Sequence, residues 1–269
     1  MIGKNYNKTH QQGQVLLITV MLLATAITIV MTVAFNTTTE TQIGVLEQES
    51  QKALTAAEAG LELALKNSPG AALSLDGLVG SGITGTAEVY SIASPVFTSP
   101  PIQRDESYTF YLGDYRATSP PEFLGTYYTG NVSLYFGEKE CGLGGTVLEI
   151  LQVKNDVSST FNRYLVDPCN YMNKPTFLGV SAGLYTIEGN TYYYRSDMLA
   201  ISADTKLLIV RVLYNGTKVA IESSVQSNKL PLQGKTVGST AKTDTGVTKR
   251  IQLFQSYPQI PTDFFVTAF

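Results

Sequence analysis

The chain has 269 residues, a formal net charge of −3 and a pI near 5.3. This balance excludes the strongly basic surface of a protein that coats nucleic acid, and no nucleic-acid site is evident. The one histidine is His10, so the rest of the chain has no imidazole for catalysis or metal binding. Charged residues reach only 15%, against roughly 25% in soluble domains, whereas tyrosine and threonine are plentiful. We therefore expect a β-rich extracellular protein that is not an enzyme and has no cofactor or metal site among its side chains. Calcium bound by backbone carbonyl groups of a loop such as 136–145 is the open alternative.

A long apolar segment, residues 15–35, follows a short polar leader that carries Lys4 and Lys8. About 20 apolar residues, at 1.5 Å rise each, span a hydrocarbon core of ~30 Å. Lysines precede the segment and the first acid, Glu40, follows it. The positive-inside rule therefore places the N-terminus in the cytoplasm and the bulk of the chain outside. A cleaved secretory signal, for which the run is long, and an uncleaved signal anchor are the alternatives.

The helix is predicted to continue beyond the membrane segment. Residues 37–66 contain no proline, and small or apolar residues recur there at alternating spacings of three and four. This seam consists of Ile43, Leu46, Ser50, Ala53, Ala57, Gly60 and Ala64, and Leu61 widens it. Residues 67–70 include Pro69 and Gly70, which end the helix. One helix of about 50 residues would be ~75 Å long.

Three features together resemble the N-terminal region of type IV pilins, in particular PilX-type minor pilins and related pseudopilins. They are a leader that ends in Gly13, an apolar helix that starts at Gln14, and the segment 56–61, over a stretch of about residues 10–66. The resemblance implies that a prepilin peptidase cuts between Gly13 and Gln14 and that the new N-terminus is methylated. It also implies that the helix moves from the inner membrane into the core of a cell-surface fibre.

The same resemblance implies the partners and the assembly residues. The partners are other pilin subunits, contacted through the helix, the prepilin peptidase and assembly machinery, the inner membrane, and an unknown surface ligand. The residues expected to pack in the membrane and the fibre are Leu16, Leu17, Ile18, Leu22, Leu23, Ile43, Leu46, Ala57 and Leu61.

One position departs from the pilin pattern. Major pilins carry a glutamate as the fifth residue after the cut, where it is thought to pair with the N-terminal amine of a neighbouring subunit; this chain has Ile18 there. A carboxylate in an apolar core is costly unless it is paired, so its absence suggests a subunit with no neighbour beyond it. We expect a minor subunit at a fibre tip, although the absence also fits an anchor that never polymerises.

The remaining chain predicts antiparallel β structure, so the expected fold class is α+β. Short strand-like runs with frequent turns indicate a sandwich or two stacked β modules. The expected boundaries are a leader at 1–13, the pilin helix at 14–66, a linker at 67–85, and β modules at 86–170 and 171–269. Asn215 and Gly216, between two strand-like runs, predict a two-residue hairpin.

The two cysteines, Cys141 and Cys169, favour a disulfide in an exported domain, worth roughly 3–4 kcal/mol in the chain-entropy model; two unpaired thiols are the alternative. Tyrosines cluster at 127–128 and 192–194, where strand alternation turns at least one ring of each cluster towards solvent. Such tyrosines suit adhesion, but ordinary β-surface residues are commoner. The tail, residues 256–265, either lies on its own domain or faces a partner.

These patterns favour a structural subunit of a type IV pilus or a pilus-like fibre. The alternative is a single-pass, membrane-anchored adhesin or binding module that does not polymerise. An anchored enzyme comes third, because no nucleophile with an adjacent base and no pair of carboxylates can be named.

Overall fold

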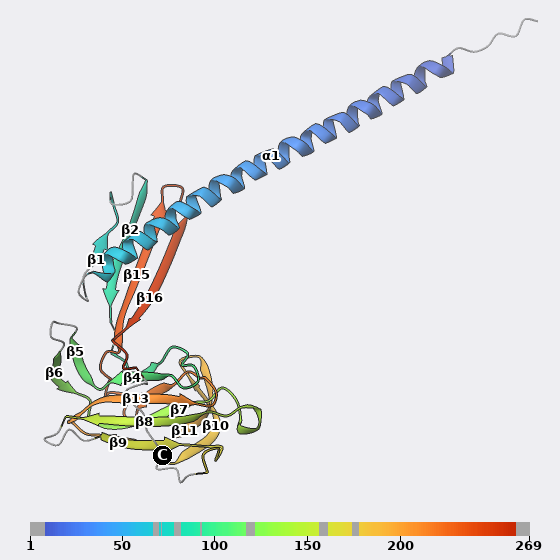
Figure 1. Ribbon diagram of the computed structural model, residues 1–269. Helices are drawn as coiled ribbons and strands as arrows, with labels where there is room; N and C mark the ends of the chain where they lie inside the picture. Colours follow the sequence, from blue (N-terminus) through green and yellow to red (C-terminus); the bar gives the residue numbers. More distant parts are fainter. Residues whose placement is uncertain are drawn as a thin grey trace, which may run out of the picture. The chain divides into compact units, whose positions relative to one another are not determined.

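A computed structural model describes residues 9–66, 70, 72–77, 82–91, 93–116, 122–155, 161–173 and 178–261 (Figure 1). Most of the predicted leader and parts of the predicted linker lie outside these residues. The described chain is one long helix, α1 (Thr9–Leu65), followed by antiparallel strands, which confirms the α+β class. At 57 residues, α1 is about 86 Å long. It begins at Thr9, before the start at Gln14 that the sequence predicts, so Gly13 lies within it; it ends just before Asn67 and Pro69, as the sequence predicts.

The strands follow α1 in short runs. They are β1 (Ala72–Ser74), β2 (Ile83–Tyr90), β3 (Val96–Thr98), β4 (Ser107–Tyr111), β5 (Gly113–Arg116), β6 (Glu122–Tyr127), β7 (Gly130–Phe136), β8 (Val147–Lys154), β9 (Phe161–Val166), β10 (Val180–Ile187), β11 (Asn190–Ser196), β12 (Leu199–Ile201), β13 (Thr205–Leu213), β14 (Ala220–Ser223), β15 (Gly234–Thr243) and β16 (Thr248–Ser256). A short 3-10 helix, η1 (Cys141–Leu143), precedes β8.

The chain forms two compact units. Unit 1 takes in Met1–Lys66, Ala72–Ala87 and Ser239–Ile251, and unit 2 takes in the rest. Within unit 1, the last turns of α1 lie on a sheet of order β1-β2-β15-β16 (Figure 1). The helix buries a stripe of small residues there, and the stripe consists of Ala53, Ala56, Ala57, Gly60 and Ala64. Small side chains let the backbones of helix and sheet approach closely.

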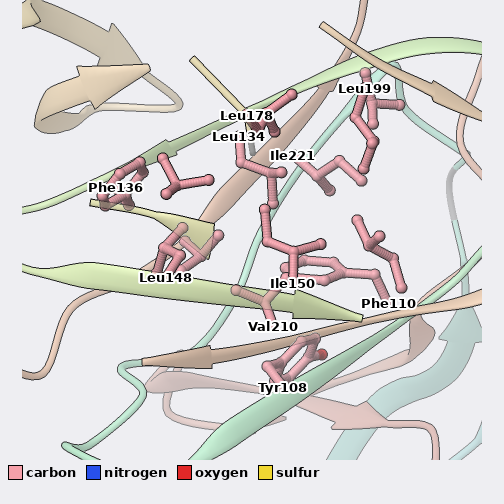
Figure 2. Close-up of a cluster of buried hydrophobic side chains, with 14 of the residues drawn as sticks. Tyr108, Phe110, Leu134, Phe136, Leu148, Ile150, Leu178, Leu199, Val210 and Ile221 are labelled. Atoms are coloured by element: carbon pink, nitrogen blue, oxygen red, sulfur yellow. The ribbon is translucent and has the colours of Figure 1, made fainter. Parts of the chain in front are cut away.

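Unit 2 contains two larger sheets and a hairpin, β5-β6. One sheet has the order β10-β11-β7-β14-β3, with β12 also paired to β7, and the other has the order β4-β13-β8-β9. Side chains from both sheets form one hydrophobic core (Figure 2). In that core Leu134 and Ile221, which face each other in register across β7 and β14, lie near Ile150 and Val210 of the second sheet.

Strands from distant parts of the sequence share these sheets. Strand β13 lies between β4 and β8, so that Val210 pairs with Tyr108 on one side and Ile150 on the other. Chain order therefore does not separate modules at 86–170 and 171–269. The hairpin predicted at Asn215 and Gly216 is wrong, because this turn carries the chain from β13 in one sheet to β14 in the other. A turn motif specifies local backbone geometry and not which strands pair.

Candidate functional site

The N-terminal half of α1 presents apolar side chains that none of the described residues covers. From Gln14 this helix is long and apolar enough to cross a membrane, and the apolar window has no buried residue; it is the one such helix in the described chain. The predicted packing residues Leu16, Leu17, Ile18, Leu22 and Leu23 are all exposed. Threonine hydroxyls in this half donate to carbonyls three or four residues earlier, as Thr28 does to Ala24 at 2.8 Å. They therefore carry no unsatisfied donor into an apolar environment.

The middle of the helix, residues 36–48, also lacks cover: apart from the half-buried Thr39, its residues are exposed. The exposed fractions of Ile43, Val45 and Leu46 are 57%, 51% and 57%. This stretch contains four threonines, a glycine and two β-branched apolar residues, all weak helix formers. The seam predicted from Ile43 to Ala64 therefore has two parts. Ile43 and Leu46 are exposed, whereas the residues from Ala53 onwards pack on the sheet of unit 1.

The last turns of the helix fit that sheet tightly. A Cβ placed on Gly60 would lie 2.6 Å from the Ser239 hydroxyl oxygen and 2.7 Å from a Leu75 methyl carbon. Ala57 is fully buried and Leu61 is half-buried, as their place in the seam predicts. At the edge of this contact the Lys52 ammonium donates to Glu49 at 2.7 Å, which lowers the pKa of that carboxyl.

Cys141 and Cys169 are joined in a disulfide, with their Cα atoms 5.3 Å apart. The bond ties η1 to the segment that follows β9. The Tyr171 hydroxyl strengthens the tie by donating to the Cys141 carbonyl oxygen at 2.6 Å, and the Tyr194 hydroxyl lies 3.1 Å from the Cys141 sulfur. The favoured interpretation of the two cysteines is confirmed, and the alternative of free thiols is wrong.

The tyrosine clusters are mostly internal. Tyr192 and Tyr194 are buried and Tyr193 packs against the core; Tyr128 is buried, its hydroxyl 2.8 Å from that of Ser223. Tyr127 is half-buried beneath the Lys206 ammonium, which lies 3.1 Å from its ring centroid. No ring of either cluster is fully exposed, so neither cluster forms an open aromatic surface.

The described part of the tail lies on unit 2. Ile260 accepts from the Ser107 hydroxyl at 3.2 Å, the Gln259 side chain accepts from the Thr109 amide at 2.7 Å, and Pro258 accepts from the Tyr111 hydroxyl at 2.6 Å. The tail therefore covers the open edge of β4, which matches the domain-covering interpretation. Residues 262–265 lie outside the described chain.

Sequence reasoning missed a hollow on unit 2 with a volume of about 350 Å³. Its lining is Ala93, Asp114, Tyr127, Tyr128, Asn228, Lys229, Leu230, Pro231 and Leu232. These residues come from four separate stretches of sequence, and none forms a local motif, so no sequence signal could have brought them together. Among the described residues no group of three His, Cys, Asp or Glu side chains could hold a metal ion.

Comparison with known protein families, with characterised proteins and with solved structures finds no match to this chain.

Proposed function

We propose that this chain is a structural subunit of a type IV pilus or a pilus-like surface fibre, at a minor or tip position. In this proposal α1 anchors the subunit in the inner membrane, with its N-terminus in the cytoplasm, and then packs among neighbouring helices in the fibre. Unit 2, with its two sheets as the layers of a sandwich, is displayed outside. Prepilin peptidase and the assembly machinery are the partners that act on the helix, and no step requires a cofactor or catalysis by this chain.

The exposed apolar side chains in the middle of the helix are the main support for the proposal. A hydrocarbon core of ~30 Å accommodates about 20 residues, so a span that starts near Val15 ends near Phe35. Ile43, Val45 and Leu46 then lie in water with more than half of their surface exposed. Fully burying one such side chain is worth roughly 1.5–3 kcal/mol. A row of uncovered apolar residues on weak helix formers is explained by a neighbouring helix that covers it in the assembled state.

The alternative, a membrane-anchored adhesin or binding module that stays monomeric, explains the apolar span equally well. It gives no reason for the apolar residues between Phe35 and the first residue of the buried stripe, Ala53. An anchor needs only a polar or flexible connection in that place.

The first test is processing. Gly13→Glu should retain the leader and remove the subunit from sheared fibres, because the peptidase recognises the glycine at the cut; Gly3→Glu, in the same leader, is the matched control. Mass spectrometry of the mature N-terminus of the wild-type chain should find an N-methylated peptide that begins at Gln14. An intact Met1 or a cut near Ala34 would refute the pilin assignment.

The second test addresses the uncovered segment. Changing Ile43 and Leu46 together to serine should leave the free energy of unfolding of the isolated chain within about 0.5 kcal/mol of the wild-type value, as thermal unfolding measures it. The reason is that both side chains are mostly exposed. The same change should strongly reduce the amount of subunit in sheared fibres. Normal incorporation of the double variant would show that no neighbour covers this segment.

A further inference from the structure

We propose that the hollow on unit 2 binds a neutral mono- or disaccharide. The inference goes beyond the assembly role and does not depend on it, because a fibre subunit and an anchored monomer would both display this site. Three properties of the hollow support it: fixed walls, free polar groups of both signs, and apolar surfaces suited to the carbon faces of a sugar ring.

The walls are held by hydrogen bonds. The Leu230 amide donates to the Ser94 carbonyl at 2.9 Å, and the Asn228 side-chain nitrogen donates to the Thr129 carbonyl at 2.7 Å. Further along the same segment, the Gln233 amide accepts from the backbone nitrogen of Tyr111 at 2.8 Å and donates to its carbonyl at 2.7 Å. Segment 228–233 is thus fixed before any ligand arrives, which reduces the entropic cost of binding.

Two charged side chains at the hollow are free. Neither Asp114, which is half-buried, nor Lys229, which is exposed, has a hydrogen-bond or ion-pair partner among the described residues. The Asn228 nitrogen is engaged, which leaves the amide oxygen for a ligand. Hydroxyl groups both donate and accept, so a polyol can satisfy Asp114, Asn228 and Lys229 together. Asp114 and Lys229 carry opposite charges, so together they give the hollow no net charge to attract an anion or a cation, which suits a neutral polyol.

The remaining lining is largely apolar. It consists of Ala93, Tyr127, Tyr128, Leu230, Pro231 and Leu232. These surfaces suit the carbon-bound hydrogens of a pyranose. A volume of about 350 Å³ lies near the lower limit of ligand sites, which run from about 300 to 1,000 Å³. The size therefore favours a mono- or disaccharide over a longer chain.

The experiment uses the full-length chain in detergent micelles on a printed array of glucose, galactose, mannose, N-acetylglucosamine and disaccharides of these sugars. The wild-type chain should bind at least one of them. Asp114→Asn should weaken that binding roughly tenfold or more, as loss of a hydrogen bond to a charged group does. Ala93→Phe should abolish binding by filling the hollow. Glu138→Gln, at an exposed acid of the same unit, is the matched control and should bind like wild type.

Thermal unfolding of each variant checks that it is folded. The proposal is overturned if the wild-type chain binds none of these sugars, or if Asp114→Asn and folded Ala93→Phe bind as wild type does. Cleavage after Gly13 and incorporation into fibres should be unchanged in Asp114→Asn. A failure on the array therefore leaves the assembly proposal intact, and a failure of cleavage leaves the saccharide proposal intact.

Discussion

The two units bury different kinds of apolar side chain. Among the described residues of unit 1, the fully buried apolar side chains are one leucine and six alanines: Leu75, Ala53, Ala56, Ala57, Ala64, Ala87 and Ala241. Unit 2 encloses a core rich in Phe, Tyr, Leu, Ile and Val (Figure 2). Burial stabilises by roughly 25 cal/mol per Å² of apolar area, so alanines contribute little each. Unit 2 therefore has a large apolar core of its own, whereas unit 1 depends on the close fit of small side chains.

The disulfide gives the largest expected effect, and it lies in unit 2. Changing Cys141 and Cys169 together to serine should lower the free energy of unfolding by roughly 3–4 kcal/mol, because the unfolded chain loses a cross-link between residues 28 apart. Chemical denaturation followed by near-UV circular dichroism measures the change. Wild-type chain treated with a reductant should match the double variant, and equal stability of the oxidised and reduced chains would contradict the prediction.

The glycines of α1 sharpen the comparison within unit 1. Gly60→Ala should destabilise unit 1 by roughly 1–3 kcal/mol, because the added methyl group meets Ser239 and Leu75. Gly44→Ala is the matched control: nothing lies within 4 Å of its Cβ position, so alanine should stabilise the helix by up to about 1 kcal/mol. Thermal unfolding monitored at 222 nm reports both. Equal effects at the two positions would mean that close fit to the sheet does not stabilise unit 1.

The helix could be predicted from the sequence because its signals are local. The apolar run, the three-four spacing and Pro69 specify its type, its end and the buried position of Ala57. Which part of the seam is covered could not be predicted. Ile43 and Ala64 obey the same spacing, but the covering sheet is built from β1, β2, β15 and β16, which only the folded chain brings together.

Strand pairing in the β region is even harder to predict from local sequence signals than the cover of the helix. Strand-like runs were recognisable from alternation, yet pairing joins segments such as β4 and β13, about a hundred residues apart. The Asn215-Gly216 motif predicts a hairpin that does not form, because the motif specifies a turn and not which sheet the next strand joins. Asp114 and Lys229 carried no signal, since their proximity depends on four stretches that meet only in the fold. The cysteine pair was predictable because exactly one pairing of two residues exists.

Alkaline pH should destabilise unit 2 before unit 1. At neutral pH this cause should not affect the stability of either unit. Burial is the largest cause that raises the pKa of Tyr111 and of Tyr135 to about 12. Within the described chain, the six tyrosines with a raised pKa all lie in unit 2. An unfolded tyrosine has a pKa near 10, so between pH 10 and 12 the unfolded chain releases protons that the folded chain retains. The stabilisation is complete below pH 10 and declines as pH rises through 12.

Unit 2 should therefore lose its near-UV signal in this range before the helix loses its signal at 222 nm, because the described part of unit 1 holds no tyrosine. Absorbance at 295 nm follows ionisation in the same samples. Tyr135→Phe should shift the loss of unit 2 to higher pH, since phenylalanine cannot ionise; its bond to Glu222 is lost as well, so stability is compared with the variant's own value at pH 8. Simultaneous loss of both signals would show that the two units unfold as one. Their different buried side chains would then not give them different stabilities.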